Sequence, residues 1–175
     1  MYILSLDQGT TGTTATIIDA KSFKFVDKEN QEFQQFFPKA GWVEHDLDEI
    51  WKSVKSTVRS VLKRNSIDPK EIISIGITNQ RETTCAFNRK GEPLAKAIVW
   101  QDRRTADFCK GLHENEELFK KEAGLPLDPY FSGTKMNWLL EHNQYVREAH
   151  KNNELLFGTI DTYLLYKLTG GREYK

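Results

Sequence analysis

The chain has 175 residues, of which 38% are hydrophobic and 29% are charged, as in a folded, water-soluble protein. Lysine and arginine together number 25, as do aspartate and glutamate, so charge gives no reason to expect nucleic acid or an anionic membrane as the main partner. No window is apolar over the length that spans a bilayer, and "MYILSLDQG" lacks the basic segment of a signal peptide. Two cysteines make no disulfide framework, which favours the cytoplasm.

The first elements are expected to be strands. Residues 2–6 predict a strand that ends at Asp7, followed by a tight connection over "QGTTG". Residues 13–19 predict the returning strand, because Thr and Ile favour extended structure. "EFQQFFP", residues 32–38, is a candidate third strand. The sequence therefore predicts an antiparallel meander at the N-terminus.

The clearest helix is predicted to begin after Asp46, which can cap it, with Glu49 three residues on, and to end near Asn65. Apolar residues recur on one of its faces at helical spacing, from Leu47 to Leu62. The next segment, "EIISIGIT", is nearly all apolar and predicts a strand. Such strands are typically covered on both faces, as in a parallel sheet.

The second half of the chain mixes short strands with helices. Residues 84–94 predict a hairpin with its turn at 89–91, and residues 97–102 predict a short strand. The expected helices lie at 103–113, 116–122 and 134–142. A strand over "LLFG" and a helix in "TIDTYLLYKLTGG" complete the pattern, which indicates an α/β chain.

Two charged residues follow the apolar strand directly, because "NQRET" places Arg81 beside Glu82. Taken alone, such a pair is most often a surface ion pair that contributes little to stability. Neighbours on a regular strand point to opposite faces, so both can reach one small ligand only if the strand end is distorted. The residues by themselves leave both interpretations open.

The segment "LDQGTTGTT", residues 6–14, is a second candidate site. Glycine lets a backbone approach a phosphate closely, and N–H groups and hydroxyls can bind its oxygens. Asp7 could hold Mg²⁺ directly or through water. The segment is neither a Walker A loop nor a dinucleotide fingerprint, and a threonine-rich hairpin turn without a ligand is the alternative.

Other suggestive groups have simpler explanations. Residues 44–46, "EHD", resemble metal ligands, but consecutive positions rarely converge on one ion, and Asp46 is expected to cap a helix. Arg103 and Arg104 are expected to form a solvated helix start or an ion pair with a nearby aspartate rather than a phosphate clamp. Cys85 is expected to be a small core residue.

Six segments together resemble the glycerol kinases, a branch of the FGGY carbohydrate kinase family. They are "DQGTTGTT", "GWVEHD", "GITNQRETT", "AIVWQDRRT", "LDPYFSGTKMNWLL" and "GTIDTYLLYKLTGG". The resemblance implies the actin-like ATPase (ribonuclease H-like) fold, with a mixed sheet whose N-terminal antiparallel meander is flanked by helices. It also implies transfer of the γ-phosphate of ATP to glycerol, giving sn-glycerol 3-phosphate, with Mg²⁺ as cofactor and ADP as product.

The resemblance implies a polyol site made of four residues. Arg81 and Glu82 would hydrogen-bond the glycerol hydroxyls, Trp100 would pack on its carbon backbone, and Tyr130 would add a hydroxyl contact. These residue types suit a polyol, because Arg only donates, an ionised Glu only accepts, and an aromatic wall contacts the C–H groups.

The resemblance also implies a nucleotide site. The residues that would meet the ATP phosphates are Thr10, Thr11, Gly12 and Thr14, and Asp7 would lie near the metal. Many glycerol kinases carry Ser-Ser-Arg after the paired threonines, whereas this chain has Gly12, Thr13 and Thr14. Thr14 therefore supplies no positive charge where the family has one.

On the same basis, residues 1–175 are expected to be an incomplete N-terminal domain of an FGGY kinase. The family's C-terminal domain and its catalytic-base Asp would lie beyond Lys175, so no catalytic residue is expected within this span and the fragment alone is expected to be inactive. The family commonly self-associates, which makes a homo-oligomer possible. The alternatives are a kinase for another small polyol or sugar, and a non-catalytic ligand-binding domain.

Overall fold

The computed structural model describes residues 1–172, and the chain divides into two compact units. Unit 1 contains Met1–Gln35 and Asp46–Gln80, and unit 2 contains Phe36–His45 and the chain from Arg81 onward. Within residues 1–172, no helix has the length and apolar character that a membrane span requires.

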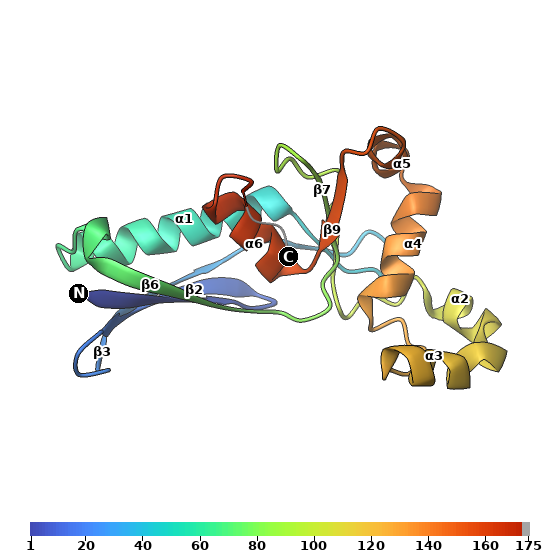
Figure 1. Cartoon of the computed structure of the whole chain (residues 1–175), viewed down its shortest axis with the longest axis horizontal. Helices are drawn as coiled ribbons and strands as arrows, with labels where there is room; N and C mark the ends of the chain where they lie inside the picture. The colour runs from blue at the N-terminus through green and yellow to red at the C-terminus, as the bar shows by residue number, and fades with distance from the viewer. Residues whose placement is uncertain (173–175) are drawn as a thin grey trace. The chain divides into compact units, whose positions relative to one another are not determined.

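Unit 1 is built on a four-stranded mixed sheet in the order β3-β2-β1-β6 (Figure 1). Its strands are β1 (Tyr2–Gln8), β2 (Gly12–Asp19), β3 (Phe25–Glu32) and β6 (Ile72–Asn79). β2 is antiparallel to both β1 and β3, while β6 is parallel to β1. The predicted meander and parallel strand are therefore confirmed.

The third strand was placed wrongly by the sequence pattern, since it covers Phe25–Glu32 rather than residues 32–38. Two parts of the predicted segment are strand in the structure. Glu32 ends β3, and Gln35–Phe36 form the two-residue β4. β3 lies at the edge of the sheet, and no residue of it is fully buried. Polar and charged residues are normal on an edge strand, so the hydrophobic signal was weak there.

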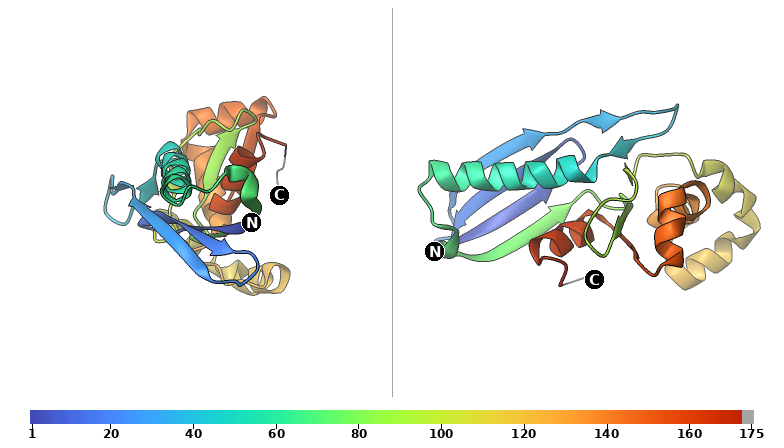
Figure 2. Two further views of the ribbon diagram at one scale, coloured as in Figure 1. Left: turned by 90° about the vertical axis from the view of Figure 1, so that its left-hand side faces the viewer. Right: turned by 90° about the horizontal axis from the view of Figure 1, so that it is seen from above.

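Helix α1 (Leu47–Arg64) packs on one face of this sheet, as the nearly end-on view in Figure 2 shows. The Asp46 carboxylate accepts hydrogen bonds from the Asp48 and Glu49 backbone N–H groups at 2.9 and 3.3 Å, and Asn65 caps the C-terminus, so both predicted ends are confirmed. The buried apolar residues between helix and sheet include Leu4, Leu6, Ala15, Ile17, Ile50, Val54 and Val61.

Strand β6 differs from its prediction in one respect. Its parallel pairing with β1 is as expected, but Ile73 and Ile75 remain 56% and 46% exposed. Coverage of both strand faces is therefore not found among residues 1–172, although the run of apolar residues indicated it.

Unit 2 contains short strands. β5 (Glu44–His45) is antiparallel to β8 (Ala97–Ile98) in a sheet ordered β4-β5-β8, and β7 (Cys85–Asn88) is antiparallel to β9 (Leu155–Gly158). The predicted turn after β7 is confirmed, because the Gly91 N–H donates to the Asn88 carbonyl at 2.8 Å.

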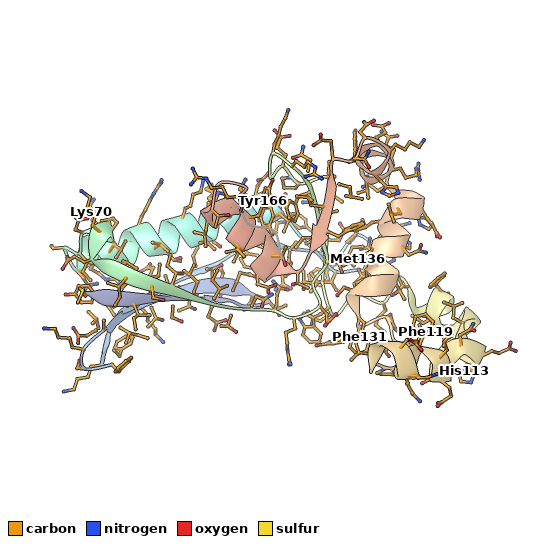
Figure 3. The ribbon with its side chains drawn as sticks, in the orientation of Figure 1. Lys70, His113, Phe119, Phe131, Met136 and Tyr166 are labelled. Atoms are coloured by element: carbon orange, nitrogen blue, oxygen red, sulfur yellow. The ribbon has the colours of Figure 1, made fainter. Side chains whose placement is uncertain are left out.

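The helices of unit 2 are α2 (Ala106–Gly111), α3 (Glu116–Ala123), α4 (Ser132–His142), α5 (Gln144–Lys151) and α6 (Ile160–Leu168), with a 3₁₀ turn at His113–Asn115. Helix α2 is shorter than predicted, and α5 was not predicted. The core joins β7, β8, α4 and α5 through Ala86, Ile98, Leu139 and Val146. Figure 3 labels Met136 on α4 and Tyr166 on α6.

Candidate functional site

The threonine segment forms the turn between β1 and β2 in unit 1. The Gly9 N–H donates to the Gly12 carbonyl at 2.9 Å, which closes the turn and leaves Thr10 and Thr11 at its tip. Thr11 is exposed and Thr10 is half-buried, so the two hydroxyl residues expected to meet phosphates lie where a ligand can reach them.

Gly12 is needed for a close backbone approach. A Cβ atom added there would lie 2.9 Å from the Gln31 carbonyl oxygen on β3, a separation that real Cβ atoms essentially never show. This contact favours glycine at position 12 of this chain. Thr14 accepts a hydrogen bond from Asn30 Nδ2 at 2.9 Å, so its hydroxyl is part of the β2–β3 pairing.

An amide pair, not predicted from the sequence, holds this turn. Gln8 is fully buried, and its side-chain Oε1 accepts from Gln80 Nε2 at 3.0 Å. Gln80 Nε2 also reaches the Gly9 carbonyl at 3.1 Å, and the Gln80 backbone N–H donates to the Gln8 carbonyl at 2.7 Å. The end of β6 is thereby tied to the start of the phosphate-sized turn. "NQRET" contained Gln80, but no spacing rule links it to Gln8.

Asp7 is exposed near the end of β1, where it pairs with Thr14 on β2 and Thr78 on β6. Mg²⁺ keeps several waters and takes one or two carboxylates together with substrate phosphates, so a single exposed aspartate beside this turn fits such an ion. Within residues 1–172, no three His, Cys, Asp or Glu side chains gather to hold a metal by themselves. Residues 44–46 accordingly form no metal cluster, and burial lowers the pKa of His45 to about 4.

Glu82 begins the polyol group of unit 2. Its φ of 64° is in the left-handed region, so the chain after β6 has the distortion that binding of one ligand by both neighbours would require. Its Oε2 accepts hydrogen bonds from the Ser132 N–H at 3.1 Å and from Ser132 Oγ at 2.6 Å, at the first residue of α4. A carboxylate is favoured at a helix N-terminus, so α4 both fixes and stabilises the Glu82 side chain. Arg81 is exposed.

Backbone pairing brings Trp100 toward the same place. Thr84 and Ile98 form an antiparallel bridge with N–H to O distances of 2.9 and 3.0 Å, and continuing that register puts Glu82 opposite Trp100. The Trp100 N–H also donates to Thr83 Oγ1 at 3.3 Å. The two segments "NQRET" and "IVWQD", which are distant in sequence, therefore end side by side.

Tyr130 joins this group through its ring and its backbone. The ring lies 5.9 Å from that of Trp100 in an edge-to-face arrangement, and 5.0 Å from that of Phe131, which is labelled in Figure 3. The Tyr130 N–H donates to Asp128 Oδ1 at 2.7 Å, and its carbonyl accepts from Lys135 Nζ at 2.8 Å. Both backbone polar groups of Tyr130 are thus held.

A buried ion pair supports the segment after β8 that carries Trp100. Asp102 is fully buried, and it accepts hydrogen bonds from the Val43 N–H at 2.7 Å and from the backbone and guanidinium of Arg104 at 2.8–2.9 Å. Arg104 also pairs with Glu44 at 2.8 Å, and its guanidinium carbon lies 3.8 Å from the Trp42 ring centroid. The expected ion pair with a nearby aspartate is confirmed, but it is buried rather than solvated.

The structure therefore forms two groups from the predicted site residues. Unit 1 contains the expected nucleotide and metal residues, Asp7, Thr10, Thr11, Gly12 and Thr14. Unit 2 contains the expected polyol residues, Arg81, Glu82, Trp100 and Tyr130. The rings of Trp100 and Tyr130 contact each other. Strand register and the hydrogen bond to Thr83 place Trp100 beside Glu82, whose carboxylate is held by Ser132. Their binding of ligands stays a prediction.

Cys85 and Cys109 are both buried and free, and burial raises the pKa of the Cys85 thiol far above its usual range. Cys85 is therefore a core residue, as predicted. Asp161 accepts a hydrogen bond from Thr159, a local role at the start of α6.

Comparison with known proteins places this geometry in a family. Residues 2–175 match the N-terminal domain of the FGGY family of carbohydrate kinases. A glycerol kinase of Brucella ovis is 52% identical over 99% of this chain and 35% of its own length. The crystal structure of Plasmodium falciparum glycerol kinase with ADP matches with a TM-score of 0.88 at 32% identity, over 96% of this chain and 34% of that one.

A ligand-bound xylulose kinase from Lactobacillus acidophilus has a TM-score of 0.80 at 20% identity, over 95% of this chain and 33% of that one, which shows a shared fold alone. These matches define a carbohydrate kinase domain and confirm the predicted actin-like fold. The chain belongs to the FGGY family, whose N-terminal domain it matches. It spans 35% of the length of the curated glycerol kinases that it resembles.

Proposed function

We propose that the protein carrying this chain is an ATP-dependent glycerol kinase that transfers the γ-phosphate of ATP to glycerol, giving sn-glycerol 3-phosphate and ADP. The observation that carries the proposal is the 52% identity to a glycerol kinase over 99% of the chain. The match includes the segments that hold the polyol group. Solved relatives at 20% identity include a xylulose kinase, so the fold alone does not select the substrate.

The polyol group has the chemistry that glycerol requires. Glu82 uses Oε2 for both Ser132 contacts, so Oε1 is the oxygen through which it would accept a glycerol O–H. Arg81 is exposed and would donate to a second hydroxyl, because its guanidinium has donors only. Trp100 and Tyr130 supply apolar ring surface for the C–H groups. Glycerol fits this set, since each carbon carries one hydroxyl and a hydrocarbon side.

The turn in unit 1 would take the ATP phosphates. Thr10 and Thr11 offer hydroxyls at the tip of the turn, and Gly12 permits close backbone approach. Asp7 would hold Mg²⁺, which neutralises phosphate charge when bound. No Lys or Arg lies in residues 6–14, so this segment cannot neutralise the phosphates by itself. The role of Thr14 in this proposal is limited to holding the β2–β3 register through Asn30.

The location proposed for the protein is the cytoplasm. Both cysteines are buried and free, and neither forms a disulfide in the described residues, as suits a reducing compartment.

The test is ADP release by the full-length protein with ATP, Mg²⁺ and one of three substrates: glycerol, xylulose or gluconate. Glycerol should give the highest kcat/KM by about a hundredfold or more, because a site built to hydrogen-bond its substrate rejects poorly matched ones strongly. If xylulose or gluconate gave a higher kcat/KM than glycerol, that compound would be the substrate in place of glycerol. Calorimetric binding of glycerol without any ADP release would instead support a non-catalytic ligand-binding protein.

A pair of variants then tests the site. Glu82→Gln should raise the KM for glycerol by about tenfold or more, because hydrogen bonds to charged groups contribute about 1.5–3 kcal/mol. Glu117→Gln is the control, since the Glu117 side chain is 89% exposed on α3 and pairs with the exposed Lys120 at 3.2 Å. Equal kinetics for both variants would remove Glu82 from the site.

A further inference from the structure

Lys135 is a fully buried lysine that no part of the proposed chemistry uses. It lies in the first turn of α4, three residues after Ser132. A buried ammonium group is costly, because leaving water disfavours the charged form. A methionine would fill the same space without that cost, and buried ion pairs are often replaceable by apolar residues without loss of stability. A role in packing therefore does not account for a lysine here.

The contacts of Lys135 all lead to the polyol group. Its Nζ donates to the Tyr130 carbonyl at 2.8 Å, while the Tyr130 N–H is held by Asp128 at 2.7 Å. In the same first turn of α4, Ser132 holds the Glu82 carboxylate. One helix start thus fixes both an acceptor and an aromatic ring of the site.

The charges around Lys135 come from three elements. Burial lowers the pKa of Lys135 to about 8, and the nearby Asp102, Glu82 and Asp128 carboxylates oppose this shift while Arg104 adds to it. Glu82 follows β6, Asp102 follows β8, and Asp128 precedes α4. The Glu82 carboxylate is thus one of three carboxylates that favour the charged form of this buried lysine.

We propose that Lys135 is a positioning residue of the polyol site: its ammonium group fixes the Tyr130 backbone and balances the charge of Glu82, without contacting the substrate. The proposal rests on the proposed glycerol kinase function. It predicts that loss of the charge weakens glycerol binding specifically, because Tyr130 and Glu82 serve glycerol and the nucleotide residues lie in unit 1.

The test measures KM for glycerol, KM for ATP and kcat in the full-length protein. Lys135→Met keeps most of the side-chain length and removes the charge, and Lys135→Arg keeps the charge. Lys121→Met, at an exposed lysine on α3, is the control. We expect Lys135→Met to raise the glycerol KM about tenfold or more while the ATP KM stays within about twofold of the wild type. Lys135→Arg should recover part of the lost glycerol affinity. Lys121→Met should match the wild type in both KM values.

The pH profile gives a second measurement that packing alone would not change. In the wild type, the ammonium group loses its proton as pH rises through about 8, so the glycerol KM should rise between about pH 7 and 9.5. Lys135→Arg should flatten this profile because Arg keeps its charge. If Lys135→Met fails to fold, the wild-type and Lys135→Arg profiles decide the matter.

Three results would overturn the proposal. They are an unchanged glycerol KM in folded Lys135→Met, a parallel change of both KM values with lowered stability, and a flat wild-type pH profile. A wild-type protein that turns over no glycerol would instead refute the proposed function, so the two failures are distinguishable.

Discussion

The buried carboxylate of Asp102 should be one of the least replaceable groups in unit 2. It accepts four hydrogen bonds, one from the Val43 N–H and three from Arg104, with distances between 2.7 and 2.9 Å. Asp102→Asn keeps the shape but replaces one acceptor oxygen by an NH₂ group. That group would face N–H donors and would leave the Arg104 guanidinium with Glu44 as its remaining ionic partner.

The magnitude follows from burial. Asp102 is 0% exposed and the Arg104 side chain 2%, so solvent cannot replace the lost partner. Breaking a buried pair by removing one charge costs about 3–5 kcal/mol, whereas an exposed pair contributes about 0–1 kcal/mol. We therefore expect Asp102→Asn to lower the free energy of unfolding by about 3–5 kcal/mol.

Urea unfolding followed by tryptophan fluorescence measures this loss, because Arg104 lies over the Trp42 and Trp138 rings. Asp107→Asn is the matched control. Asp107 pairs with Lys110 at 3.3 Å, but their side chains are 98% and 80% exposed, so its loss should change stability by less than about 0.5 kcal/mol. If Asp102→Asn lowers the free energy of unfolding by less than about 1 kcal/mol, the Asp102–Arg104 pair does not anchor the chain after β8.

Three further predictions test other parts of the two units. Ser132→Ala removes one donor to a site carboxylate and should raise the glycerol KM about fivefold without changing the ATP KM, as steady-state kinetics would show. Gly12→Ala should cost about 1–3 kcal/mol in urea unfolding through overpacking against β3, whereas Gly9→Ala, whose nearest atom is 3.4 Å away, is the milder control. Hydrogen bonds from Arg64 and Asn65 lower the pKa of Asp27 from 3.8 to about 2. The stabilisation that ionised Asp27 gives to the folded state is therefore present above pH 3.8 and lost as pH falls through about 2. Asp27→Asn should remove that pH dependence from the thermal unfolding temperature measured at about pH 2–5.

The elements that the sequence predicted well are those with local signals. Helix α1 has a cap at Asp46, an apolar stripe and a stop at Asn65, and each was found where expected. The turn after β7 follows from Asn88 and Gly91. By contrast, β3 is an exposed edge strand without an apolar pattern, and the eight-residue α5 is too short for its two buried residues, Val146 and Ala149, to recur at helical spacing.

The contacts that support the candidate site could not be predicted from the sequence, and the roles of its residues stay a prediction. Motif resemblance indicated Arg81, Glu82, Trp100 and Tyr130, and the geometry of adjacent residues said only that a shared ligand would require a distorted strand end, which the φ of Glu82 provides. The contact between Glu82 and Ser132 joins positions 50 residues apart, and no pattern in a single sequence encodes such a pairing. Charged residues are almost never fully buried unless paired, so their burial here had no signal either.

Two buried charges of unit 2 should act in different ways, and this difference can be measured. Asp102 has four donors around it and holds backbone segments together, so its neutralisation should reduce stability first. Lys135 makes a single hydrogen bond, to the Tyr130 carbonyl, among the contacts of residues 1–172, and its other neighbours act through charge. Replacing it by methionine should therefore change glycerol binding more than unfolding. If Asp102→Asn and Lys135→Met changed stability and glycerol KM in the same proportion, the buried charges would form one structural unit, and no division of roles between them would hold.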